Sequence, residues 1–246
     1  MQSAERPAPP AINYGSRATF GMLLPSVNTI AEPQITAMLP PGVSLHTTRL
    51  RLRGDAELLG MLDRLEEATA LIADAAVDRI IFHCTAVSTY SPEIVEEITR
   101  RIAAVTAIPL TITSEAIVAA LRAFDASRIV LVTPYKQATN DREVRFLAHH
   151  GITVTRERGL GIESGADMIR VEPETWYREV LAMRDPRADA YFISCTAVRS
   201  AEVIEALETE LDRPVITSNQ GMLWGALRAA GIGDRVSGFG RLLRDH

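Results

Sequence analysis

The chain has 246 residues, of which 47% are hydrophobic, 23% charged and 5% aromatic, so it can bury a core and is not a disordered or low-complexity chain. The formal net charge is −5, from 26 basic and 31 acidic residues, and the arginines are scattered. This argues against a nucleic-acid partner, because a phosphate-binding surface needs clustered cations.

The N-terminal segment is rich in proline, with three prolines among the first ten residues and no apolar stretch. This predicts a flexible leader over residues 1–17 rather than a signal peptide or a membrane anchor. We therefore expect a cytoplasmic protein with no membrane partner. Since that compartment is reducing, Cys84 and Cys195 are interpreted as thiols.

From residue 18 onward, apolar runs of strand length alternate with segments in which apolar residues recur at i, i+3 and i+4. In chain order, strands are expected at Thr19–Leu24, Ser44–Leu50, Arg79–Phe82, Leu110–Thr113, Arg128–Thr133, Ile152–Glu157, Ala190–Ser194 and Pro214–Thr217. Helices are expected at Glu57–Val77, Pro92–Val105, Glu115–Phe124, Thr139–His150, Pro173–Met183, Ala201–Leu211 and Met222–Ala230. This alternation favours an α/β fold with mainly parallel, buried strands.

The strongest signal in the sequence is an internal repeat. The segment Ile81–Val87 (IFHCTAV) recurs as Phe192–Val198 (FISCTAV), and Ile108–Ser114 (IPLTITS) recurs as Arg213–Ser218 (RPVITS). Self-similarity of this kind indicates a duplicated structural unit.

The spacing within the two copies agrees as well, since 59 residues separate Pro25 from Cys84 and 61 separate Pro134 from Cys195. We therefore predict two similar Rossmann-like halves, residues 18–126 and 127–240, related by a pseudo-twofold axis, with a tail over 241–246. Ligands of parallel α/β sheets bind at the carboxyl ends of the strands. The active site is accordingly expected in the crevice between the halves.

Each cysteine follows a predicted strand, so the pseudo-twofold axis should place Cys84 and Cys195 on opposite sides of one small substrate. One thiolate then acts as nucleophile or base while the opposing thiol supplies a proton. An intermediate with charged oxygens needs nearby donors. The expected donors are main-chain N–H groups after each cysteine and the hydroxyls of Ser26, Thr85, Tyr135 and Thr196.

Motifs for metals and cofactors are absent from the sequence: there is no Cys-x-x-Cys, no His-Glu-x-x-His and no Walker A segment. No metal and no cofactor are therefore expected. His83 immediately precedes Cys84, and strand alternation should turn its side chain away from the thiol.

Several motifs together resemble the aspartate/glutamate racemase superfamily, in the branch that contains arylmalonate decarboxylases and maleate cis–trans isomerases. They cover nearly the whole chain beyond the leader. These motifs are Pro25-Ser26-Val27-Asn28-Thr29, Cys84-Thr85-Ala86, Thr133-Pro134-Tyr135, Gly161-Ile162, Cys195-Thr196-Ala197 and Gly238-Phe239-Gly240-Arg241-Leu242.

The resemblance implies a role for each cysteine. Arylmalonate decarboxylases keep only the second cysteine and have glycine at the first position, whereas maleate isomerases carry both, as this chain does. By this similarity Cys84 adds to an alkene carbon of maleate, the adduct rotates about the resulting single bond, and elimination gives fumarate. Cys195 supplies or removes the proton, or stabilises the adduct.

The same resemblance implies a set of residues that bind the carboxylate of the substrate. For Asn219 a helix N-cap is an equally good interpretation. The size of the pocket should depend on the loops Ser88–Ser91 and Glu163–Asp167. The expected substrate-binding residues are Pro25, Ser26, Asn28, Thr85, Ala86, Tyr135, Thr196, Ala197 and Asn219.

The sequence thus predicts a cofactor-independent isomerase or racemase of a small mono- or dicarboxylate, with maleate as the first choice of substrate. One alternative is an arylmalonate-type decarboxylase or a racemase of 2-substituted acids. Another is a non-catalytic protein of the same fold that binds a small carboxylate. A homo-oligomer is expected, because most soluble assemblies are closed and symmetric.

Overall fold

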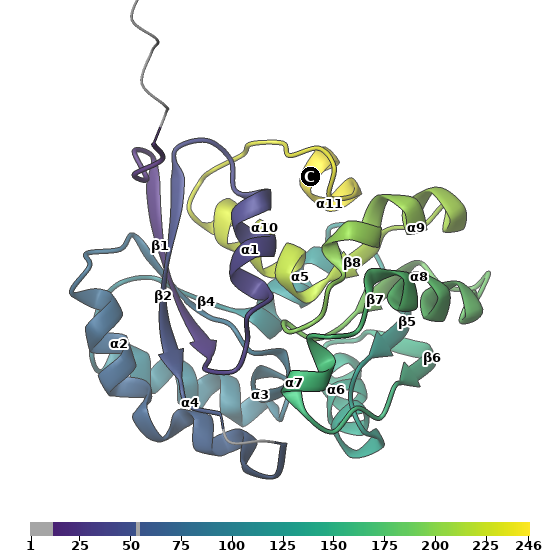
Figure 1. The fold of residues 1–246 in the computed structure, drawn as a ribbon, viewed down its shortest axis with the longest axis horizontal. Helices are drawn as coiled ribbons and strands as arrows, with labels where there is room; N and C mark the ends of the chain where they lie inside the picture. Colours follow the sequence, from purple (N-terminus) through teal and green to yellow (C-terminus); the bar gives the residue numbers. More distant parts are fainter. Residues whose placement is uncertain (1–11, 53–54) are drawn as a thin grey trace, which may run out of the picture.

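The computed structural model describes residues 12–52 and 55–246, which form two parallel sheets flanked by helices (Figure 1). Residues 1–11 of the expected leader lie outside the described residues. The end of that leader is joined to the rest of the protein, because Arg17 forms an ion pair with Asp234 at 2.5 Å.

Both sheets have four strands in the same order, which confirms the α/β prediction. The order is β2-β1-β3-β4 in the first and β6-β5-β7-β8 in the second, and all paired strands run parallel. The strands are β1 (Ala18–Pro25), β2 (Val43–Leu50), β3 (Arg79–Phe82), β4 (Leu110–Ile112), β5 (Arg128–Thr133), β6 (Thr153–Gly159), β7 (Ala190–Ile193) and β8 (Val215–Thr217).

Helical segments connect the strands of each sheet. The α-helices are α1 (Ala31–Met38), α2 (Leu65–Ala73), α3 (Thr85–Ser88), α4 (Pro92–Ala103), α5 (Thr113–Arg122), α6 (Gln137–His149), α7 (Gly165–Met168), α8 (Pro173–Ala182), α9 (Ile204–Leu211), α10 (Ser218–Ala229) and α11 (Arg241–Asp245). The 3₁₀ segments are η1 (Asp55–Arg64) and η2 (Ala201–Val203).

The helical pattern of the sequence misses the short helices. Helices α1, α3, α7 and α11 have between four and eight residues, which is too few turns for an apolar period to show. The single helix predicted over Glu57–Val77 is wrong in its first part, where the 3₁₀ segment η1 precedes α2. Gly60 lies within η1, and glycine is a poor α-helix former.

The last long helix of each half packs on the sheet of the other half. Helix α5 follows β4, yet its Ile117 and Leu121 join the core over β5 and β7. Helix α10 follows β8, yet its Met222 and Leu223 pack with Phe20 of β1. Figure 1 shows α5 and α10 next to each other between the two sheets.

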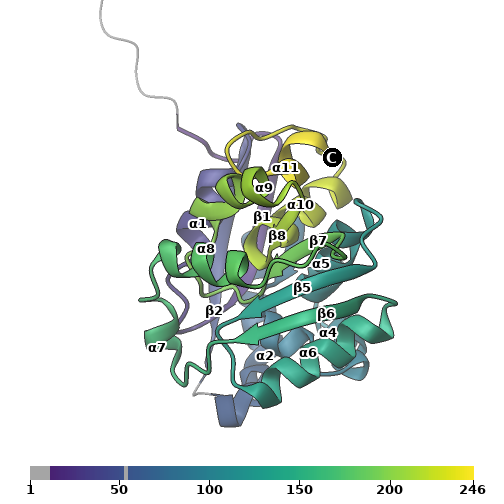
Figure 2. The ribbon, with the colours of Figure 1, turned by 90° about the vertical axis from the view of Figure 1, so that its right-hand side faces the viewer.

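This exchange of helices closes both cores. Helices α5 and α6 cover one face of the second sheet, and α8 and α9 cover the other (Figure 2). The predicted tail holds α11, whose buried Leu242 and Leu243 join the cores of different sheets. Neither half completes its core alone, so the division between residues 126 and 127 stays a prediction.

Replacing Gly225 of α10 with alanine is expected to lower the free energy of unfolding by about 1 kcal/mol. A Cβ at Gly225 would lie 2.8 Å from the Cβ of Ala116 in α5. Overpacking of this kind costs roughly 1–3 kcal/mol, which exceeds the helix-propensity gain of about 1 kcal/mol. Chemical denaturation measures the difference.

Gly233→Ala is the matched control for this prediction, because a Cβ at Gly233 has no neighbour within 4 Å. Adding Ala116→Gly to Gly225→Ala should recover part of the loss, since it reopens the space between the helices. A Gly225→Ala protein as stable as the wild type would show that α5 and α10 are less closely packed.

Candidate active site

A cavity of about 330 Å³ lies where the carboxyl ends of both sheets meet, and residues of both halves line it. Cys84 and Cys195 both line this cavity, each two residues after a central strand of its sheet. Most of the residues expected to bind the substrate line it as well. They are Pro25, Asn28, Thr85, Ala86, Tyr135, Thr196 and Ala197.

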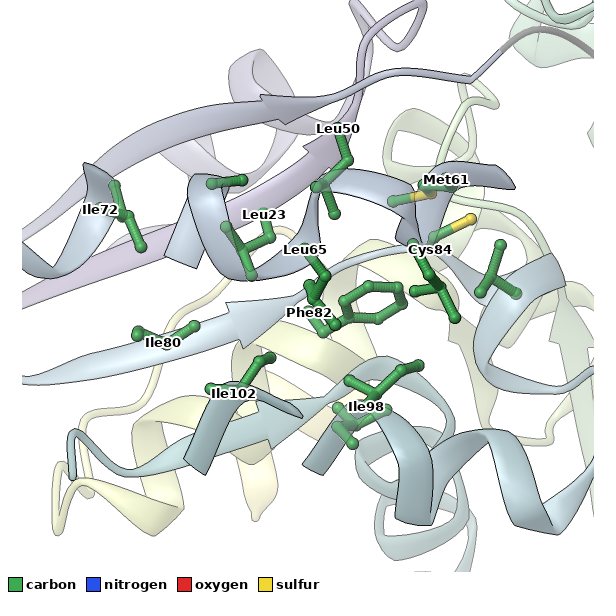
Figure 3. Close-up of a cluster of buried hydrophobic side chains, with 14 of the residues drawn as sticks. Leu23, Leu50, Met61, Leu65, Ile72, Ile80, Phe82, Cys84, Ile98 and Ile102 are labelled. Atoms are coloured by element: carbon green, nitrogen blue, oxygen red, sulfur yellow. The ribbon is translucent and has the colours of Figure 1, made fainter. Parts of the chain in front are cut away.

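Cys84 is placed by the buried core of the first sheet. Figure 3 shows it past the end of the strand that carries Ile80 and Phe82, within the cluster of buried side chains on that face. The residue has an extended backbone and directly precedes α3, and only 5% of its surface is exposed. The chain therefore presents this thiol to the cavity from a rigid strand end.

Cys195 has an unusual backbone conformation, with a φ of 105°. A residue with a side chain is strained in this region, and such strain clusters at functional sites. The Cys195 N–H donates to Ser218 Oγ at 3.0 Å, and the Ala197 N–H donates to the Cys195 sulfur at 3.3 Å. The second contact stabilises negative charge on the sulfur.

Tyr135 lines the cavity and interacts with both thiols. Its hydroxyl hydrogen-bonds Cys195, and its pKa lies well above the usual value, chiefly because it is buried and secondly because of the charge on Cys195. The charge on Cys84 acts in the same direction. Tyr135 therefore remains a neutral phenol and a hydrogen-bond donor in the site.

Hydrogen bonds across the crevice hold the two halves in register. Asn28 Oδ1 accepts from the main-chain N–H groups of Ile30 and Ala31, while its Nδ2 donates to Thr196 Oγ1 at 3.0 Å. Across the same crevice, Thr85 Oγ1 donates to Ser218 Oγ at 2.9 Å. Cavity residues of each half are thus oriented by the other half.

Two residues expected to bind substrate do not line the cavity. Ser26 is exposed, and its hydroxyl accepts from the Leu52 N–H at 3.2 Å. Asn219 is buried behind the cavity, where its Nδ2 donates to Gln34 Oε1 at 2.7 Å. Asn219 is not the helix cap either, because Thr217 caps α10.

His83 is turned away from the cavity, as strand alternation predicts. Its ring nitrogens lie 2.8 Å from Thr113 Oγ1 and 2.8 Å from Asn219 Oδ1. Burial lowers the pKa of His83 to about 4, so the ring is neutral near pH 7. His83 and Cys84 therefore do not form a catalytic dyad.

The remaining wall of the cavity comes from the segments that follow β1 and β2, from η1, and from α7 with the two residues before it, and it is mostly apolar. The loop Glu163–Asp167, expected to set the pocket size, contributes four residues, whereas the loop Ser88–Ser91 contributes none. Apart from Val27, the larger apolar members of this wall belong to no motif in the sequence and were not predicted. The wall residues outside the predicted set are Val27, Leu52, Leu58, Glu163, Ser164, Gly165, Ala166 and Met168.

The lining of the cavity contains no lysine, arginine or histidine within the described residues. Its one carboxylate, Glu163, is exposed and forms an ion pair with Lys136 at 2.7 Å. Hydroxyl, amide and main-chain N–H groups are therefore what the cavity offers to a substrate carboxylate.

The described part of the chain has neither a candidate metal site nor a candidate membrane-spanning helix. Among residues 12–52 and 55–246 there is no group of three or more His, Cys, Asp and Glu side chains that could hold a metal ion. Over the same ranges, no helix has the length and apolar character needed to cross a membrane.

Comparisons with known proteins agree with this architecture. The maleate isomerase of Nocardia farcinica is 30% identical over 238 residues, covering 92% of this chain and 95% of the relative. A crystal structure of the maleate isomerase Iso from Pseudomonas putida S16 with maleate has a TM-score of 0.86 at 25% identity, covering 92% of this chain and 97% of that one.

A second structure bears on the chemistry of the site. It is a cysteine-to-serine mutant of the Nocardia farcinica maleate cis–trans isomerase with a covalently bound succinylcysteine intermediate. The TM-score is 0.85 at 25% identity, with 93% of this chain and 99% of that chain covered. The model of the arylmalonate decarboxylase family matches residues 20–243. The chain therefore belongs to the arylmalonate decarboxylase family.

Proposed function

We propose that the protein is a cofactor-independent isomerase that converts maleate to fumarate through a covalent cysteine adduct. The observation that carries this proposal is the pair of cysteines, one from each half, in the wall of a single cavity. The succinylcysteine intermediate in a related maleate isomerase supports it. A decarboxylase that needs only the second cysteine has no use for the thiol of Cys84.

The reaction follows from the position of the two thiols. The Cys84 thiolate attacks one alkene carbon of maleate, so that a carbon–sulfur bond forms and the π bond breaks. The electron pair passes to the neighbouring carbon and its carboxylate, and that carbon takes the proton of the Cys195 thiol. The product is a succinyl group on Cys84.

The remaining steps reverse the addition after the adduct has changed its conformation. The adduct rotates about what is now a single carbon–carbon bond, and the Cys195 thiolate removes a proton from the same carbon. The carbon–sulfur bond then breaks, fumarate leaves, and the Cys84 thiolate is restored. Tyr135, Thr85 and the main-chain N–H groups near Cys195 are placed to donate to the charged carboxylate oxygens.

When the protein is incubated with maleate in deuterated buffer, we expect fumarate to form. Proton NMR measures the conversion. Because the Cys195 thiol exchanges with solvent, deuterium should enter the vinyl positions during turnover. The same screen includes arylmalonates and amino acids, for which carbon dioxide loss or α-deuteration is the readout. An enzyme that leaves maleate unchanged and decarboxylates an arylmalonate would overturn the proposal.

The decarboxylase or racemase alternative is favoured by a different observation. The wall of the cavity includes four large or branched apolar side chains, those of Val27, Leu52, Leu58 and Met168. An apolar wall suits an aryl or alkyl substituent better than a second carboxylate. The match to the arylmalonate decarboxylase family model points in the same direction. The substrate screen decides between these two activities.

A homo-oligomer in the cytoplasm stays a prediction from the sequence. It is supported by the usual symmetry of soluble assemblies and by the interpretation of both cysteines as thiols, which a reducing compartment preserves. Light scattering of the purified protein measures the oligomeric state.

A further inference from the structure

A buried ionisable group is hydrogen-bonded to the residue that precedes Cys195. Glu143 of α6 is fully buried, and its Oε1 accepts a hydrogen bond from Ser194 Oγ at 2.6 Å. Ser194 immediately precedes the strained Cys195. The other carboxyl oxygen, Oε2, is buried and has no hydrogen-bond partner within the described residues. A buried polar atom without a partner is costly to keep and calls for an explanation.

The first half of the repeat has a different residue at the position that corresponds to Glu143. Glu143 lies nine residues after Pro134, and Gln34 lies nine residues after Pro25, the corresponding proline of the first half. The two residues therefore correspond in the repeat. Gln34 is neutral, and its Oε1 accepts from Asn219 Nδ2. The first half therefore uses an amide where the second half uses a carboxyl group.

The residues that precede the two cysteines also differ between the halves. His83 precedes Cys84 and is a neutral imidazole near pH 7, since burial lowers its pKa to about 4. Ser194 precedes Cys195 and connects it to Glu143. His83 bonds Thr113 and Asn219 instead, so a carboxyl group holds the residue before Cys195 and neutral groups hold the residue before Cys84.

Glu143 is electrostatically coupled to the site. Burial raises its pKa to about 7, while the bond from Ser194 acts in the opposite direction. Its charge in turn raises the pKa of Tyr135, the residue that hydrogen-bonds Cys195. A negative charge at this place disfavours a second negative charge on the nearby sulfur.

We propose that Glu143 is a positioning residue for Cys195, which anchors Ser194 at the end of β7 and supplies a buried negative charge that keeps the proton on the Cys195 thiol. The charge is needed because the Ala197 N–H and the Tyr135 hydroxyl both stabilise the thiolate. This inference rests on the proposed function, in which Cys195 must deliver a proton while Cys84 attacks.

Other polar and charged residues of α6 interact with groups other than Glu143. Arg142 lies over the ring of Tyr90, with 4.5 Å between the guanidinium carbon and the ring centroid. Gln137 of α6 donates to Glu157 of β6, and His149 of α6 acts on the pKa of Glu93 in α4. For Glu143 itself, burial and Ser194 are the causes of the shifted pKa.

The test measures the proton affinity of each thiol separately and needs no substrate. In a Cys84→Ser protein Cys195 is the remaining cysteine, so the pH dependence of its alkylation by iodoacetamide gives the midpoint of its ionisation. Adding Glu143→Gln keeps an oxygen that accepts from Ser194 but removes the charge. The midpoint is expected to fall by about one pH unit.

The matched control uses Cys195→Ser and reads Cys84 by the same assay. Adding Glu143→Gln is expected to move the Cys84 midpoint by much less, because Glu143 is hydrogen-bonded to the residue that precedes the other cysteine. An unchanged Cys195 midpoint overturns the proposal, and so do equal shifts at both cysteines, which would indicate a general loosening of the fold.

Ser194→Ala keeps the proposal testable if Glu143→Gln does not fold. Loss of the Ser194 hydroxyl raises the pKa of Glu143, so less negative charge is present near neutral pH. The Cys195 midpoint should then move in the same direction by a smaller amount, and no movement overturns the proposal. Failure of this inference leaves maleate turnover by the wild-type protein intact, whereas failure of the proposed function leaves the alkylation midpoints intact.

Discussion

Replacing Cys84 with serine is expected to reduce maleate turnover by about 10³-fold or more. Serine keeps the size and the hydrogen-bonding capacity of the side chain, but its hydroxyl does not ionise near neutral pH. The attack on the alkene carbon is therefore lost, while binding of the substrate is retained. Steady-state kinetics should show the loss in kcat, with KM little changed.

The control for Cys84→Ser is Thr99→Ala, an exposed position on α4 that does not line the cavity and should keep full activity. Unchanged far-UV circular dichroism checks that the serine protein is folded. A Cys84→Ser protein that still decarboxylates an arylmalonate would support the alternative in which the second cysteine works alone.

Replacing Cys195 with serine is expected to trap the covalent adduct and to reduce turnover by roughly 10²–10³-fold. The Cys84 thiolate still attacks and the neighbouring carbon takes its proton from water, but without the opposing thiolate as base that proton is removed only slowly from the succinyl group. The serine adds no new backbone strain, because it keeps the Cβ that Cys195 already has at a φ of 105°. Intact-protein mass spectrometry after incubation with maleate should show a gain of one maleate per chain.

Peptide mapping places this adduct on Cys84, and the double variant Cys84→Ser/Cys195→Ser should gain no mass. An adduct on Cys195 in the Cys84→Ser protein would reverse the two roles. If neither single variant retains an adduct and both turn over normally, two-thiol chemistry is excluded.

Local sequence was enough to place the central strands, because β1, β3, β5 and β7 are short apolar runs that are mostly buried. The edge strands β2 and β6 are more polar and partly exposed, and they were still placed to within two residues at each end. The predicted strand Arg79–Phe82 has the observed bounds, and Ser44–Leu50 differs from β2 by one residue. The short helices were missed, since a few residues cannot display a helical period. The 3₁₀ segment η1 was mistaken for the first part of an α-helix, because its apolar residues follow a helical spacing although it contains Gly60.

The candidate site was predicted only in part. Repeated motifs place the cysteines and the residues next to them, because equivalent strand ends meet at the same edge of paired sheets. The position of Asn219 could not be predicted, since its partners Gln34 and His83 are far away in the sequence. Leu52 and Leu58 were missed for a similar reason: they line the cavity only because β2 ends beside β1.

By itself, the sequence determined the duplicated α/β architecture, the parallel strands and the equivalence of Cys84 and Cys195. These properties follow from local patterns and from repetition, which are visible in the amino-acid sequence alone. The tertiary structure alone decided that α5 and α10 exchange sheets and that Glu143 bonds the residue before Cys195. Such contacts join residues that are distant in the sequence, and they depend on how side chains of both halves pack together.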